Sequence, residues 1–366
     1  MPACTRRVVR GLFALALLCA NAGAIACPLC MGAFQQSKAQ ELVSAPHAVL
    51  AVPTADPSRF RVIEIVKGER PASGTIEGGY PRNGPALQAA GSASGRPVLL
   101  IRDDLFPTWT VLGRIGADHA GWLRKLAEGK PAAQMSPEDW RARVALAMPY
   151  LEDAEPLAAE LAYGEVAAAP YAALLAARPA ISAPVVRRSV ANPANAPRQP
   201  VNLLLLGIAG DAHDARALEK RLEAAHAAGD AANLGSLIAA DLQLRGPARL
   251  AWVEENYLVD RRRSSAEIEA ALLALSVHGN ASAAISRERV IASYRTFMNA
   301  HRDIAGYVAR DLAAWQCWDV VPEYVALMKS GTPQQYPSKI AIVAYLRQSP
   351  NANAIDFSLP AMAGAR

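Results

Sequence analysis

The sequence predicts an α+β protein in which a small β-rich module precedes an all-α array of helical repeats. Short β-branched runs bounded by Gly, Pro, Asp and Ser, which are typical of strands, concentrate between residues 45 and 115. Beyond Gly121 these runs stop, and apolar segments recur every 32 to 37 residues. With 366 residues, of which 52% are hydrophobic and 19% charged, the chain is long enough to fold into two domains.

The first 26 residues have the pattern of a secretory signal peptide. Arginines at positions 6, 7 and 10 precede an apolar run over 12–19, and a small-x-small cleavage site ends at Ala26. The apolar run is shorter than the ~20 residues that span a bilayer, and no later run reaches that length. We therefore expect cleavage after Ala26, export to the periplasm or the extracellular space, and a mature chain without a transmembrane segment.

A Cys-Pro-Leu-Cys motif at 27–30 begins the predicted mature chain. Cys27 and Cys30 are candidates for a redox-active pair or a disulfide, because close thiols tend to pair in oxidising compartments. Four interpretations stay open: a structural disulfide, a metal or partner site, a thiol–disulfide function, and a lipid tether at Cys27. Cys317, between two tryptophans, is expected to be a free and slowly reacting thiol.

The strand signals begin soon after this motif. A short helix is expected over 32–43, followed by strands at 47–52, 60–67, 97–102 and 109–112. A loop rich in Gly, Ala, Ser and Pro separates the second and third strands, over 84–95. These residues predict a small sheet or barrel of four to six strands.

Two resemblances follow from this module. A cysteine motif, a strand, and a strand ending in Lys67-Gly68 make it similar to netrin-like domains, which are OB barrels. That family ties its N-terminal cysteines to later ones in the barrel. This chain has none between Cys30 and Cys317, so the resemblance implies the barrel and not an inhibitory mechanism. The whole chain also resembles a group of exported bacterial proteins that open with CPxC after the signal and end in helices, and this resemblance implies no activity.

The helical part has a repeat. Ser136 followed by Pro137 and two acids predicts a helix start. Amphipathic helices are expected between the recurring apolar segments, giving two helices per repeat. The stretch LGIAGDAHDARAL at 206–218 resembles a bacterial HEAT repeat, and weaker copies cover about 200–350. The recurring segments are LLLLGIAGD (203–211), LIAADLQLRG (237–246), ALLALSVHG (271–279), YVARDLAAWQ (307–316) and IAIVAYLRQ (340–348).

An array of this kind buries its recurring segments and exposes the charges of the intervening helices. We therefore expect a set of buried apolar side chains and a set of exposed charged ones. The buried set is Leu204, Leu205, Leu237, Leu272, Leu275, Ile340 and Val343. The exposed set is Glu219, Lys220, Glu254 and Glu255.

The predicted organisation is a signal peptide over 1–26, a CPLC motif and β-rich module over 27–120, and a HEAT-like domain over 121–366.

The net charge of +5 falls to +2 without the three signal-peptide arginines, which argues against nucleic acid as a partner. The chain lacks Walker, dinucleotide-binding, HExxH and GxSxG motifs, and its six histidines have no metal-ligand spacing. No catalytic residue, cofactor or metal site is predicted.

The function predicted from these features is protein interaction or scaffolding in the cell envelope, through the helical repeat surface. The alternative is a thiol–disulfide or metal-handling protein centred on Cys27 and Cys30. Whether the chain is an enzyme stays undecided at this level, with a binding protein favoured.

Overall fold

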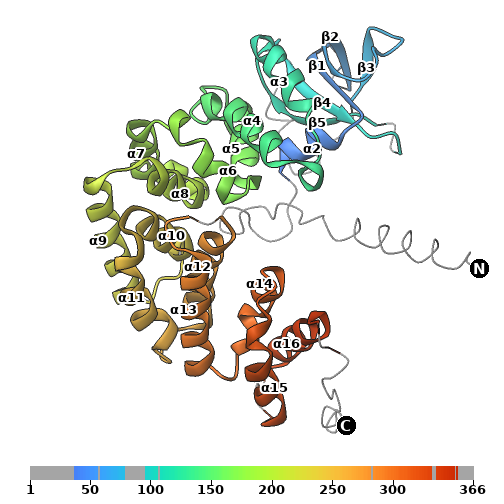
Figure 1. The fold of residues 1–366 in the computed structure, drawn as a ribbon. Helices are drawn as coiled ribbons and strands as arrows, with labels where there is room; N and C mark the ends of the chain where they lie inside the picture. The colour runs from blue at the N-terminus through green and yellow to red at the C-terminus, as the bar shows by residue number, and fades with distance from the viewer. Residues whose placement is uncertain are drawn as a thin grey trace, which may run out of the picture. The chain divides into compact units, whose positions relative to one another are not determined.

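The computed structural model describes residues 37–56, 58–78, 95–105, 108–281, 283–331, 335–350 and 352. They form an α+β protein, with a small antiparallel sheet followed by many helices (Figure 1). These residues divide into two compact units, the first ending at Ala173 and the second beginning at Leu174.

The first unit contains a five-stranded antiparallel sheet. Its strands are β1 (His47–Pro53), β2 (Arg59–Lys67), β3 (Thr75–Glu77), β4 (Val98–Arg102) and β5 (Thr110–Arg114). They lie in the order β3-β2-β1-β4-β5, and a parallel bridge joins Gly78, after β3, to Trp109, before β5. The two edges of the sheet therefore approach each other. The four strands expected from the sequence are confirmed, and β3, a three-residue strand, was not expected.

One face of this sheet carries a continuous apolar core. Alternate residues of the strands point to this face, because side chains of a strand alternate between its two faces. The buried members of the cluster are Val49, Ala51, Phe60, Val62, Ile76, Val98, Leu100 and Trp109.

Two helices pack directly on this sheet, and two more pack on those helices. They are α2 (Lys38–Ser44), α3 (Ala120–Ala127), α4 (Pro137–Ala147) and α5 (Pro156–Ala168). The expected helix start at Ser136 is confirmed, because its hydroxyl and the Asp139 carboxylate form a capping box. Gly113 of β5 lets α5 approach closely, since a Cβ there would lie 3.2 Å from Leu157.

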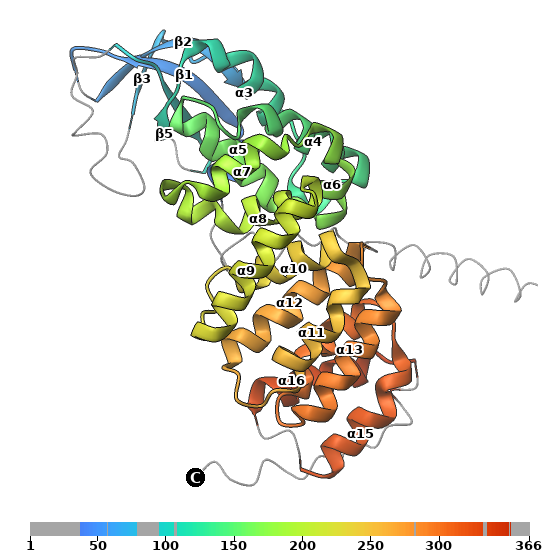
Figure 2. The same cartoon turned by 90° about the vertical axis from the view of Figure 1, so that its left-hand side faces the viewer.

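The second unit is helical throughout its described residues. After α6 (Tyr171–Ala176), which crosses the division, ten further helices follow one another along the described chain (Figure 2). They are α7 (Ala183–Ala191), α8 (Gln199–Ala209), α9 (Ala212–Ala228), α10 (Leu234–Arg245), α11 (Leu250–Val253), α12 (Ser265–Ala281), α13 (Arg287–Ala300), α14 (Ala309–Ala314), α15 (Val321–Lys329) and α16 (Tyr336–Gln348). A π-helical turn, Glu254–Val259, extends α11.

Packing in the second unit follows sequence order. Helix α8 packs on α7 and α10, α10 packs on α9 and α12, and α12 packs on α13. The α8–α10 contact is close, because a Cβ on Gly207 would lie 2.6 Å from the Cα of Ala240. Of the residues expected to be buried, Leu204, Leu205, Leu237, Leu272 and Leu275 are buried.

Some expected positions in the second unit are corrected by the structure. Ile340 is 52% exposed and Val343 is half-buried, because α16 turns Ile342, Tyr345 and Leu346 into the core instead. Lys220 and Glu255 are exposed as expected.

Two acidic residues of that expected exposed set are only partly exposed. Glu219 pairs with Arg245 at 2.6 Å, and Glu254 accepts a hydrogen bond from Ser293 at 2.6 Å. Both carboxylates are therefore drawn toward neighbouring helices by partners that lie 26 and 39 residues away in the chain.

The sequence-based division at 120/121 marks the change from strands to helices, whereas the compact units divide at Ala173. Helices α3 to α5 accompany the sheet because they supply the apolar side chains that cover it, with Trp122, Leu123 and Leu157 among them. None of the helices that the structure describes is long and apolar enough to cross a membrane.

Candidate functional site

The predicted thiol pair cannot be placed. Cys27 and Cys30 lie outside the described residues, so the interpretations of the CPLC motif stay predictions. The described part of the chain begins at Ser37, seven residues after Cys30, where the Ser37 hydroxyl and the Gln40 side chain cap α2.

A pocket of about 200 Å³ lies in the first unit, between α2, α4, α5 and the turn that precedes α4. Its inner part is formed by buried side chains and its rim by partly or fully exposed ones. The inner residues are Val43, Trp140, Arg143, Glu165 and Ala168. The rim residues are Gln40, Ser44, Lys130, Pro131, Ala132 and Met135.

An ion pair lies at the inner end of this pocket. The Arg143 guanidinium donates from Nε to Glu165 Oε2 and from Nη2 to Oε1, and both side chains are about 5% exposed. Nη1 of Arg143 donates to the backbone oxygen of Leu126. The lack of a side chain at Gly129 leaves room for the guanidinium, because a Cβ at that position would lie 1.9 Å from Nη1 of Arg143. A buried charge needs such partners, since an unpaired one is costly.

Two further cations lie near Arg143. Lys130 on the rim donates to Asp139 Oδ2 at 2.7 Å, and this bond lowers the pKa of Asp139 to about 2. Lys67, at the end of β2, donates to the backbone oxygen of Val43 at 2.6 Å. Burial, followed by the charge of Arg143, lowers the pKa of Lys67. Positive charge therefore exceeds negative charge around the inner pocket.

Trp140 is part of this wall. The residue is 1% exposed, and its indole Nε1 has no hydrogen-bond partner among the described residues. Sequence reasoning did not identify this pocket. Its charged residues are spread over α4, α5 and a turn, at a spacing that matches no motif.

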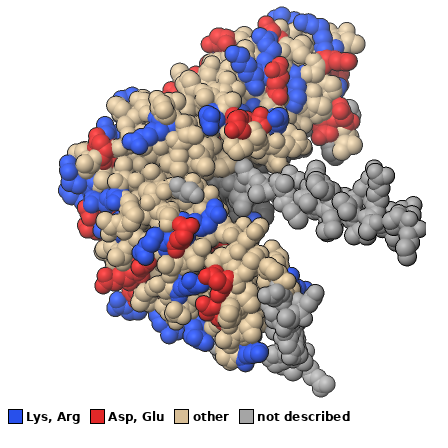
Figure 3. Space-filling view, viewed as in Figure 1, with Lys and Arg blue, Asp and Glu red and all other residues tan. Residues whose placement is uncertain are grey.

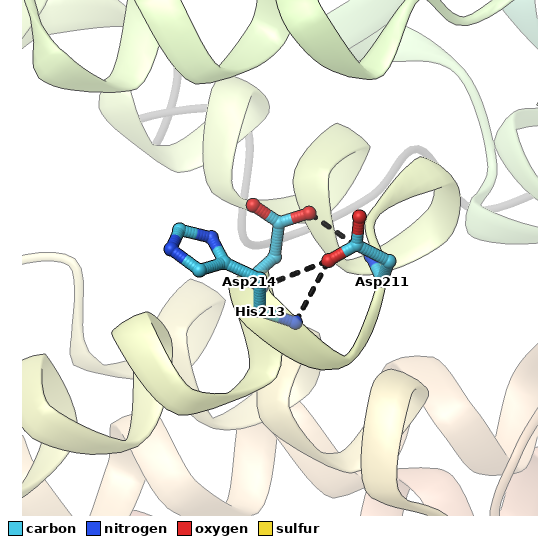
Figure 4. A group of neighbouring side chains, drawn as sticks. All are labelled: Asp211, His213 and Asp214. Carbon is cyan, nitrogen blue, oxygen red and sulfur yellow. Dashed lines mark hydrogen bonds between the residues drawn. The ribbon is translucent and has the colours of Figure 1, made fainter.

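A second group, Asp211, His213 and Asp214, has the residue types of a metal site but is used as a helix cap. Asp211 Oδ1 accepts from the backbone nitrogens of His213 and Asp214, and Asp214 Oδ2 accepts from the Asp211 nitrogen. Figure 4 shows the His213 ring and the Asp211 carboxylate on opposite sides of Asp214.

Arg187 of α7 already supplies the cation for these carboxylates. It donates twice to Asp214, at 2.7 and 2.6 Å, and once to Asp211, at 2.7 Å. The bond from Arg187 is the largest cause of the lowered pKa of Asp214. The group therefore caps α9 and joins it to α7.

Cys317 carries a free thiol among the described residues. It is half-buried, and its Sγ donates to Asp319 Oδ1 at 2.8 Å. Burial, followed by the bond to Asp319, raises the pKa of Cys317 to about 12. A thiol that stays protonated is a poor nucleophile, and the slow reactivity of Cys317 stays a prediction.

Comparisons of the chain with protein-family models, with curated proteins and with solved structures found no match.

Proposed function

We propose that the chain is an exported cell-envelope protein that binds another protein through the surface of a HEAT-like helical array. The observation that carries this proposal is the sequence-order packing of the second unit, where α8, α10 and α12 contact one another in succession. Repeat arrays pack in this one-dimensional way and present long surfaces to partners.

The helices that lie between the recurring apolar segments, such as α9, support a binding surface. Helix α9 buries Leu218 and Leu222 and exposes Arg216, Lys220 and Glu223. In Figure 3 basic and acidic side chains are interspersed over the face in view, which suits a protein partner better than a polyanion.

Helix α16 presents two large apolar side chains to solvent. Tyr336 and Ile340 lie four residues apart, on one side of the helix, and are 60% and 52% exposed. Large apolar side chains exposed next to each other are a common feature of protein interfaces.

The first unit is proposed to be an OB-like barrel, as in netrin-like domains. Two observations support this: the strand order β3-β2-β1-β4-β5, and the parallel bridge from Gly78 to Trp109 that links the outer strands. An OB fold is a partly open five-stranded barrel.

Site-specific photocrosslinking in the exporting cell tests the binding function. A photoreactive residue is placed at Lys220, Glu255 or Arg289. These residues are exposed on α9, on the π-helical turn after α11 and on α13. The expected result is one partner captured from all three positions. The matched control is Lys125, an exposed position on α3 of the first unit, which should not capture that partner.

A double change of Tyr336 and Ile340 to serine should reduce the yield of the same crosslink without lowering the melting temperature. Equal capture from Lys125, or no specific product from any of the three positions, would contradict the proposal. The thiol hypothesis makes a different prediction: capture would depend on Cys27 and Cys30 and would be lost in their double serine variant.

A further inference from the structure

The pocket belongs to the first unit, whereas the proposed protein-binding surface belongs to the second. Its hydrogen-bonding groups are mostly donors. Arg143 uses three of its five N–H groups in the bonds to Glu165 and Leu126, which leaves two. Lys130 gives one of its three N–H groups to Asp139, which leaves two.

Acceptors are few in the same pocket. Among its lining residues Glu165 alone carries a carboxylate, and each of its oxygens is bonded to Arg143. Gln40 uses its side-chain oxygen to accept from the Ser37 nitrogen. Lys130 and Arg143 are the cations of the lining and Glu165 is its carboxylate, while Asp139, which pairs with Lys130, is not among the lining residues. The group that satisfies such a pocket is an anion that offers several acceptor atoms.

The remaining walls are apolar. Val43, Pro131, Ala132, Met135, Ala168 and the Trp140 ring line the pocket. The volume of about 200 Å³ is below the range of roughly 300–1,000 Å³ that holds drug-sized ligands. An occupant must therefore be small and must combine a charged end with a short apolar body.

We propose that this pocket binds a small organic carboxylate, with the carboxylate near Lys130 and Arg143 and the apolar body against Val43, Met135 and Trp140. The buried Arg143–Glu165 pair holds the guanidinium in place before the ligand arrives. A pocket whose donors are preorganised loses less conformational entropy when a ligand binds.

Calorimetric titration of the full chain with benzoate and with hexanoate tests the proposal. At least one should bind saturably, and benzyl alcohol, which matches benzoate in shape but is neutral, should bind much more weakly. Lys130→Met should weaken carboxylate binding about tenfold, the loss of one charge-assisted hydrogen bond. The matched control is Lys125→Met, an exposed lysine of α3 that does not line the pocket.

A second variant keeps the test independent of Lys130. Ala132→Phe fills the rim without changing a charge and should abolish binding while the melting curve stays like that of the parent chain. No saturable binding of either carboxylate would overturn the proposal. So would equal affinity for benzyl alcohol, or binding unchanged in both pocket variants. Binding of inorganic phosphate alone would show an anion site without the apolar part and would also refute it.

Discussion

At the scale of single residues, buried polar groups show which contacts the fold depends on. Arg143 and Glu165 are each about 5% exposed and pair across α4 and α5, whereas Lys130 and Asp139 pair near the surface. Removing one partner costs more stability in a buried ion pair than in an exposed one. Only in the buried pair is the remaining charge left without water around it.

Glu165→Gln should therefore destabilise the first unit by about 3–5 kcal/mol, as expected when one member of a buried ion pair is lost. Lys130→Met should lower the free energy of unfolding by less than about 1 kcal/mol. Urea unfolding followed by tryptophan fluorescence measures both. The double variant Arg143→Met/Glu165→Leu should recover most of the loss, since neither charge remains. Equal losses in the two single variants would argue against this account.

His278 of α12 makes stability depend on pH. It is fully buried, and its Nε2 donates to the Ala239 backbone oxygen at 3.0 Å. Burial lowers the pKa of His278 to about 4. Because the folded pKa lies below the unfolded value of about 6.5, protonation favours the unfolded chain. The contribution of neutral His278 to the free energy of unfolding is complete above pH 6.5 and is lost as the pH falls toward 4.

The loss attributable to His278 between pH 7 and pH 4 should be on the order of 3 kcal/mol. His278→Gln retains a donor for Ala239 and has no proton to gain. Unfolding free energies measured at both pH values should thus show a smaller drop for the variant than for the parent chain. An identical drop in the two proteins would mean that His278 is not buried as a neutral group.

At the scale of elements, close helix contacts decide where small residues are required. Gly207 of α8 faces Ala240 of α10, and a Cβ there would lie 2.6 Å from the Ala240 Cα and 2.8 Å from its Cβ. A Cβ added to Gly121 of α3 would have no other atom within 4 Å. Both glycines lie within helices, Gly121 in the first turn of α3 and Gly207 in the last turn of α8.

Gly207→Ala should destabilise the second unit by about 1–3 kcal/mol, because overpacking pushes α8 away from α10. Gly121→Ala should instead stabilise the first unit by up to about 1 kcal/mol, through the higher helix propensity of alanine. Thermal unfolding of both variants provides the comparison. A stabilised Gly207→Ala would show that α8 and α10 do not pack as closely as described.

At the scale of the whole molecule, the described residues form two compact units that meet in the chain at Ala173 and Leu174. The units differ in how their contacts are made. The sheet joins segments that are distant in the chain, such as β1 with β4, whereas α7 to α13 pack largely on near neighbours in sequence. The proposed small-ligand pocket and the proposed protein-binding surface belong to different units, so each can be changed without the other.

Much of the fold could be predicted from the sequence alone. Four of the strands, the capped start of α4 and the buried leucines of α8, α10 and α12 follow from β-branched runs, a capping pattern and helical periodicity. These signals are local, since each depends on residues a few positions apart. The candidate thiols Cys27 and Cys30 were also chosen from a local motif, and their role stays a prediction.

Only the tertiary structure decided the rest. The exposure of Ile340 depends on which face of α16 meets its neighbours, and the pairing of Glu219 with Arg245 depends on a partner 26 residues away. The pocket around Arg143 also depends on contacts between distant segments, because α2, α4 and α5 contribute lining residues from position 40 to position 168. Periodicity specifies that a helix has a buried face, but the chemistry of a pocket depends on which faces meet.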